Sequence, residues 1–258
     1  MAEAVPVHAG GWPLPFWIAH RGAGKLAPEN TLAAFRHGAS FGYRAFECDV
    51  KLSADGTLFL LHDATLERTT SGSGTAGARP WSELSRLDAG SWHSPAYAGE
   101  PIPSFEALAT YVRRNGFALD IEIKPTPGQE HETGRAVGLE VCRLWAGADA
   151  SGWPVFTSFR PEALQGARET APQVLRGLLL DTLWAGWEGV AQALDCAAVI
   201  TNHKVMSVEL AAQLHAQGRR ALVYTVNDAE RVAQMVLCGV DGIVTDAVDR
   251  FDPTQRPA

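Results

Sequence analysis

The sequence predicts an α/β protein in which about eight strand–helix units close into a (β/α)₈ TIM barrel. Three observations lead to this fold class. Short apolar runs alternate with longer amphipathic segments from end to end. The length of 258 residues suits one barrel, since such barrels commonly use about 250 residues. No linker or change of composition marks a second domain, so we expect residues 1–258 to form a single barrel domain, with a doubly wound open sheet as the alternative.

The predicted strands are short apolar runs, at residues 16–20, 45–51, 58–62, 118–124, 155–159, 174–180, 198–201, 221–226 and 242–245. The predicted helices have apolar residues at helical spacing, at 31–41, 104–115, 130–147, 161–170, 184–194, 207–217 and 229–238. The second and third strands follow one another without a helix, which predicts a hairpin.

Residues that begin and end helices support these boundaries. Gly218 and Gly239 follow two of the predicted helices, where glycine commonly stops a helix. Ser207 and the pair 227–228 stand where N-caps are expected. Pro161 suits the first turn of its helix. The helix boundaries therefore agree with the alternation of strands and helices.

One segment, residues 64–103, interrupts the alternation. Its Ser-Gly run between Ser71 and Gly77 lacks the pattern of a phosphate-binding loop and indicates a flexible loop. Residues 81–87 allow at most two helical turns. The segment follows the strand that ends at His62, and barrel active sites lie at the C-terminal ends of the strands. We therefore expect a small insertion after the hairpin that caps the active-site face.

Charge and cysteine content exclude several classes of protein. The formal net charge of −7 disfavours binding to nucleic acids or anionic membranes, which requires a basic surface, but it allows a local anion site. No apolar run is long enough for a transmembrane helix, and the first fifteen residues do not resemble a signal peptide. The cysteines are far apart, without metal-ligand spacing. We expect a cytoplasmic protein without stable membrane association.

Acidic residues alternate along two of the predicted strands. Glu47 and Asp49 share one face of the first of these strands, opposite Cys48. In the strand 118–124, Asp120, Glu122 and Lys124 likewise share a face. Inward-facing carboxylates are costly unless they are compensated. Mg²⁺ or Ca²⁺ would compensate them better than zinc, which prefers Cys and His ligands. The alternative is a buried network of ion pairs with Lys124 and Arg21.

Two histidines end neighbouring strands at the same predicted barrel mouth. His20 and His62 could act as general base and general acid. A serine nucleophile has no support, because the chain has no G-x-S-x-G motif. Arg21 and Lys124 would supply positive charge for an anionic substrate.

Three further residues are weaker candidates. Glu29 lies in the segment that opens the first helix, where Asn30 is a candidate N-cap, so Glu29 either belongs to the site or only to the helix start. Trp92 in the insertion and Tyr224 at a strand end are the aromatic residues that we expect to contact substrate.

Eight motifs, in order along the chain, resemble the glycerophosphodiester phosphodiesterase family, in its short cytoplasmic bacterial form. They are AHRGAGKLAPENT (19–31), FECDVKLSADG (46–56), LLHDATLERTTSGSG (60–74), LDAGSW (87–92), IPSFEAL (102–108), IEIK (121–124), VYTVND (223–228) and DGIVTD (241–246). Each motif alone is weak, whereas their order and span across most of the chain make the resemblance specific.

The resemblance implies a (β/α)₈ barrel that hydrolyses glycerophosphodiesters to an alcohol and sn-glycerol 3-phosphate. It implies one divalent cation, Mg²⁺ or Ca²⁺, whose ligands match Glu47, Asp49 and Glu122. The family's catalytic histidines match His20 and His62, and its phosphate-binding residues match Arg21 and Lys124. The implied partner is a small-molecule substrate.

Two departures from the family pattern stand out. Tyr224 occupies a position that is often tryptophan, which affects the alcohol side of the pocket. The chain after Asp246 is short, so the last helix should be short or missing. Neither the residues nor the resemblance decides which histidine is the base, whether water or a substrate hydroxyl attacks, or which alcohol is preferred. A non-catalytic binding protein and an enzyme acting on a related phospholipid are the competing interpretations.

Overall fold

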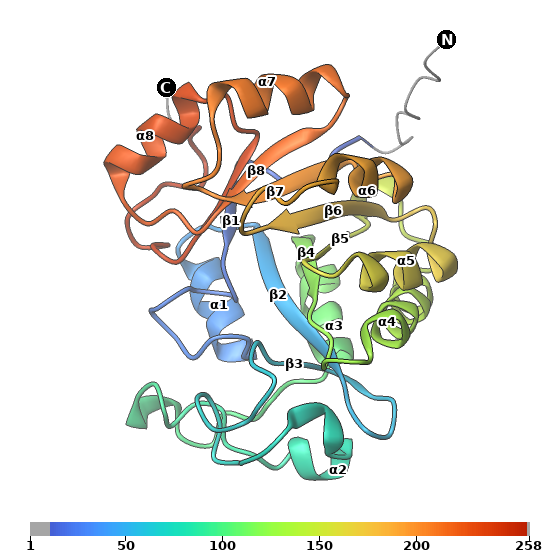
Figure 1. Cartoon of the computed structure of the whole chain (residues 1–258). Helices are drawn as coiled ribbons and strands as arrows, with labels where there is room; N and C mark the ends of the chain where they lie inside the picture. The colour runs from blue at the N-terminus through green and yellow to red at the C-terminus, as the bar shows by residue number, and fades with distance from the viewer. Residues whose placement is uncertain (1–10, 257–258) are drawn as a thin grey trace.

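The computed structural model describes residues 11–256, and eight parallel strands close into a barrel (Figure 1). These strands are β1 (Trp17–Ala19), β2 (Ala45–Leu52), β4 (Ala118–Ile123), β5 (Val155–Ser158), β6 (Leu175–Leu180), β7 (Ala198–Asn202), β8 (Arg220–Tyr224) and β9 (Gly242–Thr245). The barrel closes at β1, where Ala19 pairs with Phe46 on one side and Thr245 on the other. The (β/α)₈ TIM barrel is confirmed, and the open-sheet alternative is wrong. Our expectation about a signal peptide falls largely on residues 1–10, outside the described residues.

A ninth strand, β3 (Leu58–Leu60), pairs antiparallel with β2 and lies outside the closed barrel. This pairing confirms the predicted hairpin, with Val50 opposite Leu60. The strand ends at Leu60 rather than at the expected residue 62, and His62 lies in the bend that follows. The side chain of His62 therefore projects from a loop at the end of the hairpin.

Helices surround the barrel: α1 (Leu32–Ser40), α3 (Phe105–Asn115), α4 (Glu130–Leu144), α5 (Pro161–Thr170), α6 (Trp187–Ala193), α7 (Val208–Ala216) and α8 (Ala229–Leu237). Ser207 and Asp228 are the N-caps of α7 and α8, as predicted. Gly218 and Gly239 have φ of +73° and +84° just after these helices. After β9, the residues described up to 256 form no helix, as predicted.

Two helix starts differ from the predictions. The N-cap of α1 is Thr31, whose Oγ1 accepts a hydrogen bond from the amide of Ala34, so the expectation for Asn30 is wrong. Helix α6 begins at Trp187 instead of residue 184. The residue before it, Gly186, has a left-handed φ of +93°, which separates the exposed Trp184 from the helix.

The insertion lies beside β3 and has a small hydrophobic core of its own (Figure 1). It contains two 3₁₀ turns, η1 (Ala76–Ala78) and η2 (Pro95–Tyr97), and the single-turn helix α2 (Trp81–Leu84); a further 3₁₀ turn, η3 (Ala150–Gly152), precedes β5. Leu66, Leu84 and Ile102 pack against Phe59 of β3. The Oε1 atom of Glu100 accepts a hydrogen bond from the amide of Ala33 at the start of α1. These contacts place the insertion next to the loop that joins β1 to α1.

Candidate active site

His20 follows β1, and an aspartate at the end of β9 fixes the orientation of its ring. The Nδ1 atom lies 2.6 Å from Oδ1 of Asp246, whose other oxygen accepts a hydrogen bond from Asn227. An ionised carboxylate only accepts hydrogen bonds, so this contact favours the neutral tautomer with its proton on Nδ1. In that tautomer Nε2 carries no proton and can accept one. Nε2 faces Glu47, with its Oε2 at 3.8 Å.

Glu47 belongs to a cluster of three buried carboxylates from two neighbouring strands. Glu47 and Asp49 come from β2, and Glu122 of β4 lies opposite Asp49 in the strand register. One oxygen from each carboxylate lies within 4.8 Å of the others. Burial and the neighbouring Asp49 carboxylate raise the pKa of Glu47 well above its usual value, and burial raises the pKa of Glu122 to about 7. Burial therefore disfavours the ionised form of these two carboxyl groups unless a cation compensates them.

The donor set fits a hard divalent cation. Oε1 of Glu47 and Oδ1 of Asp49 are buried and accept no hydrogen bond within the described part of the chain. Carboxylate oxygens are the ligands that Mg²⁺ and Ca²⁺ prefer. The cluster could therefore bind a metal ion.

Two cations flank the carboxylates and form part of the ion-pair network that was the alternative interpretation. Nε of Arg21 lies 3.1 Å from Oδ2 of Asp49, and Nζ of Lys124 lies 2.6 Å from Oε1 of Glu122. Burial alone would raise the pKa of Asp49, but Arg21 and Lys124 hold it well below its usual range. Ion pairs and carboxylate oxygens without a hydrogen bond thus coexist in one cluster.

Asn30 belongs to this cluster, which explains why it does not cap α1. Its Nδ2 donates to Oδ2 of Asp49 at 2.8 Å, and its Oδ1 accepts from the amide of Asp49 at 3.0 Å. The backbone of Asn30 is left-handed, with φ of +59°. Arg21 also has a positive φ, of +51°. Both residues thus hold uncommon backbone conformations that direct polar groups toward Asp49.

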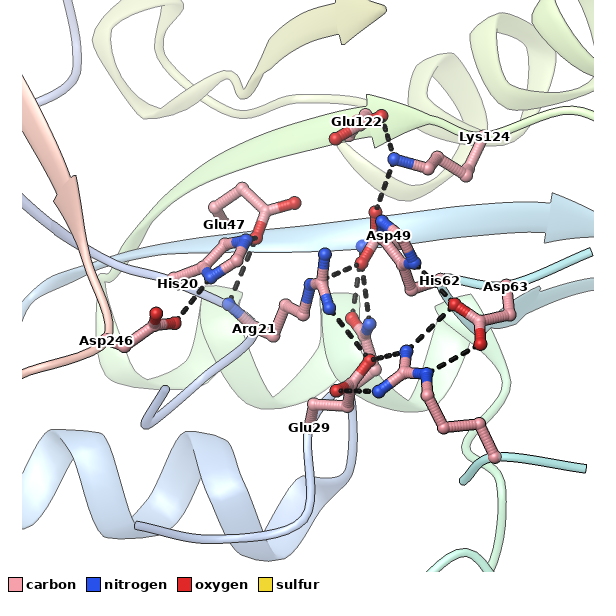
Figure 2. A network of polar contacts seen from close by, with 12 residues as sticks. His20, Arg21, Glu29, Glu47, Asp49, His62, Asp63, Glu122, Lys124 and Asp246 are labelled. Atoms are coloured by element: carbon pink, nitrogen blue, oxygen red, sulfur yellow. Dashed lines mark hydrogen bonds and ion pairs between the residues drawn. The ribbon is translucent and has the colours of Figure 1, made fainter. Parts of the chain in front are cut away.

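A chain of polar contacts joins Arg21 to His62 through Arg68 of the insertion (Figure 2). Glu29 accepts hydrogen bonds from Arg21 and from Arg68 of the insertion. Arg68 also contacts both oxygens of Asp63 and holds the pKa of Asp63 well below its usual range. Oδ1 of Asp63 lies 2.7 Å from Nδ1 of His62. Burial lowers the pKa of His62, which favours a neutral ring.

Two adjacent cavities open at this site. An inner cavity of about 190 Å³ is bordered by both histidines, and an outer cavity of about 540 Å³ extends beyond His62. Four residues line both cavities: His62, Glu122, Lys124 and Phe159. The two cavities therefore meet where the acidic cluster, the lysine and one histidine converge.

The two aromatic candidates differ in position. Tyr224 lines the inner cavity and packs edge-to-face on Phe159, with ring centroids 5.7 Å apart. Trp92 lines neither cavity; its side chain donates to the carbonyl of Ala89, and the residue is 40% exposed. The structure thus brings Tyr224, but not Trp92, to the other predicted site residues.

Sequence reasoning missed the residues that hold the histidines. Asp63 directly follows His62, and this adjacency was a usable signal. Asp246 ends the last strand, but its partner His20 is 226 positions away, and no local pattern connects them. The role of Arg68 in joining Glu29 to Asp63 has no sequence signal of its own.

Comparison with known proteins identifies the family. The model of the glycerophosphoryl diester phosphodiesterase family matches residues 20–250. The chain belongs to this family. YhdW of Bacillus subtilis is 32% identical over 242 residues, covering 90% of this chain and 94% of that protein. The glycerophosphodiester phosphodiesterase of Caldanaerobacter subterraneus is 31% identical, covering 89% and 93%. The expected resemblance is confirmed.

A solved structure extends the comparison to the fold and to a ligand. A phosphodiesterase of Oleispira antarctica, in complex with the product sn-glycerol-3-phosphate, superposes with a TM-score of 0.84 at 32% identity, covering 92% of this chain and 95% of that one. Membership of this hydrolase family makes the chain an enzyme that cleaves glycerophosphodiesters. Among the described residues, no helix has the length and apolar character to cross a membrane.

Proposed function

We propose that the protein is a metal-dependent hydrolase that converts glycerophosphodiesters to an alcohol and sn-glycerol 3-phosphate, with His20 and His62 as general acid and base. One observation carries this proposal. Two histidines, each held at Nδ1 by an aspartate, border the same cavity as two cations and two members of the carboxylate cluster, Glu47 and Glu122. The product bound by the Oleispira relative supports the choice of substrate.

The cation would be held by Glu47, Asp49 and Glu122, and Mg²⁺ or Ca²⁺ fits this all-oxygen set. When bound, it supplies Lewis-acid stabilisation of negative charge on a phosphoryl oxygen. Arg21 and Lys124 place fixed positive charge beside the same carboxylates. They bind and orient the phosphate, because opposite charges at short range in a buried site attract strongly.

The two histidines move the protons of the reaction. Nε2 of one ring takes a proton from the attacking hydroxyl as the new P–O bond forms, and the other ring gives a proton to the alcohol oxygen as its bond to phosphorus breaks. Asp246 and Asp63 keep each ring oriented by holding its Nδ1. Which histidine is the base is left open by this symmetry.

The attacking hydroxyl belongs either to water or to the glycerol of the substrate. The second route passes through a cyclic phosphate that water then opens. Rapid-quench analysis distinguishes these routes. The cyclic route is wrong if no cyclic phosphate forms at any time and a diester without the neighbouring hydroxyl is cleaved at full rate.

One assay tests the proposed function. The enzyme is incubated with glycerophosphocholine, glycerophosphoinositol or a lysophospholipid, with Mg²⁺ or with EDTA, and glycerol 3-phosphate is measured. We expect release from the glycerophosphodiesters, loss with EDTA and recovery on adding cation. Undiminished activity after complete cation removal would contradict metal dependence, and a strong preference for the lysophospholipid would favour the phospholipid enzyme.

The remaining sequence predictions are proposals about the same site. The insertion 64–103 would cover part of the mouth, since Ala64 and Thr65 line the outer cavity. Glu29 would position Arg21, which it contacts at 2.9 Å, and Tyr224 would contact the glycerol or the alcohol. Contact between Trp92 and substrate stays a prediction. A cytoplasmic location is supported by the free state of all four cysteines.

A further inference from the structure

The outer cavity has a basic residue that the proposed mechanism does not use. Lys51 lies on the same face of β2 as Glu47 and Asp49, nearer the C-terminal end of the strand. Only 1% of the residue is exposed to solvent. Its ammonium donates one hydrogen bond, to the carbonyl of Lys124 at 3.0 Å, and the residue lines the outer cavity. An ammonium has three donor hydrogens, so Lys51 has donor capacity left for a ligand there.

A second cation lines the same cavity. This cation is Arg160, which directly precedes the ten-residue helix α5. The first residue of α5 is Pro161. Within the described chain its guanidinium makes no hydrogen bond or ion pair. Hydrogen bonds from backbone amides lower the pKa of Glu130, and nearby Arg160 contributes less to this shift; Oε1 of Glu130 accepts from the amide of Gly128 and not from Arg160. The start of α5 adds partial positive charge at this position.

The acidic residues of the outer cavity already have partners. Asp63 accepts hydrogen bonds from Arg68 and contacts His62. Glu122 contacts Lys124 and belongs to the carboxylate cluster. The charge that remains without a partner in this cavity is therefore positive.

The arrangement of the two cavities assigns the two arms of a diester. The cavities meet at His62, Glu122 and Lys124, where the phosphate binds under the proposed function. The inner cavity, of about 190 Å³, suits the small glycerol, and the outer cavity, of about 540 Å³, has room for a larger alcohol. We propose that the outer cavity is the subsite for the departing alcohol, and that Lys51 and Arg160 there bind an anionic group, a phosphate or a carboxylate, on that alcohol. This inference rests on the proposed function.

Matched substrates test the proposal at pH 7 with saturating Mg²⁺. Glycerophosphoinositol and its 4-phosphate differ by one anionic group, and glycerophosphoglycerate presents a carboxylate instead. We expect kcat/KM for the 4-phosphate, for glycerophosphoglycerate or for both to exceed that for glycerophosphoinositol by about tenfold or more, and glycerophosphocholine to be the poorest substrate. The anionic substrate with the higher kcat/KM shows whether the subsite prefers a phosphate or a carboxylate.

Variants show whether the preference comes from these residues. Arg160→Ala and Lys51→Met should each reduce the ratio of kcat/KM between anionic and neutral substrates several-fold. Arg114→Ala is the matched control, because Arg114 is exposed in the last turn of α3, before β4 begins and hence at the opposite end of the barrel. It should leave the ratio unchanged. Because both kcat/KM values are measured on the same preparation, their ratio does not depend on the fraction of the enzyme that is folded.

The possible failures are distinguishable. Equal kcat/KM for neutral and anionic substrates in the unaltered enzyme, or a preference that survives Arg160→Ala and Lys51→Met, overturns the anionic subsite while hydrolysis itself stands. Absence of hydrolysis of every glycerophosphodiester overturns the proposed function.

Discussion

The interior of the barrel has two contrasting halves. In the charged half, β2 and β4 present two facing pairs of carboxylates, Glu47 with Asp120 and Asp49 with Glu122. Lys51 of β2 and Lys124, the residue after β4, add two cations beside them. In the apolar half, β6 to β9 present aliphatic side chains: Leu179, Ile200, Leu222 and Val244. Both halves have the same parallel pairing and belong to one closed sheet.

The two halves differ in what they contribute: the apolar half stabilises the barrel, and the charged half holds the ionisable groups that can take part in chemistry. Aliphatic side chains are stabilised by burial alone, so the apolar half requires no ligand. Buried carboxylates are costly unless ions or hydrogen bonds compensate them. In the charged half, Arg21, Lys124 and Asn30 compensate only some of the oxygens (Figure 2). The carboxylates that are not fully compensated are those that could bind a cation.

Removing a histidine beside the charged half should have the largest effect on turnover. We expect His62→Ala to lower kcat by about 10²–10⁴-fold at saturating cation, the usual contribution of general acid–base catalysis. Steady-state kinetics on a glycerophosphodiester measures this. His131→Ala is the control, since His131 is exposed on α4. Near-normal turnover of the His62 variant would remove His62 from catalysis.

Removing a carboxylate should act first on the cation. We expect Glu47→Gln to weaken cation binding by about 100-fold or more, because even an outer partner of a metal ligand commonly contributes 10–100-fold. Isothermal titration calorimetry with Mg²⁺ and Ca²⁺ measures the Kd. Exposed Glu83 of α2 offers the control Glu83→Gln, which should leave the Kd unchanged. Unaltered affinity in the Glu47 variant would exclude Glu47 as a ligand.

Protons should compete with the cation in the charged half. The pKa of Glu122 is raised to about 7, so below this pH the carboxyl group is mostly protonated in the cation-free protein. The apparent Kd should then rise about tenfold for each pH unit below 7, and binding should release protons. Calorimetry at several pH values, in buffers of different ionisation enthalpy, measures both effects. A Kd that is constant between pH 5.5 and 7 would contradict this expectation.

A substitution in the apolar half should affect stability far more than chemistry. Leu222 of β8 is fully buried, and we expect Leu222→Ala to lower the free energy of unfolding by about 2–5 kcal/mol. At 25 °C the folded fraction should retain kcat within a few-fold. Urea unfolding and active-site titration measure the two quantities. Leu237→Ala, at a position 80% exposed, should change stability by less than about 0.5 kcal/mol. If Leu222→Ala lowered kcat as much as His62→Ala does, the apolar half would not be limited to a role in stability.

The sequence was sufficient to predict features that depend on local periodicity. Alternation of strands and helices predicted the closed barrel, and alternation within β2 placed Glu47 and Asp49 on one face, as the cluster confirms. Features that depend on distant partners were not predictable. Asn30 and Thr31 are both good N-caps, and only the hydrogen bonds between Asn30 and Asp49 decide between them. Trp184 continued the apolar spacing of α6, although the structure leaves it exposed.

The contact between His20 and Asp246 ties the site to the order in which the chain is made. His20 precedes its partner Asp246 by 226 positions, so the ribosome synthesises the histidine well before the aspartate. Until β9 has emerged and paired with β1, the barrel has a gap and the ring of His20 lacks its partner. A nascent or truncated chain therefore contains the carboxylates of β2 and β4 without an oriented His20. The growing polypeptide therefore acquires an oriented His20 only after Asp246 has been synthesised.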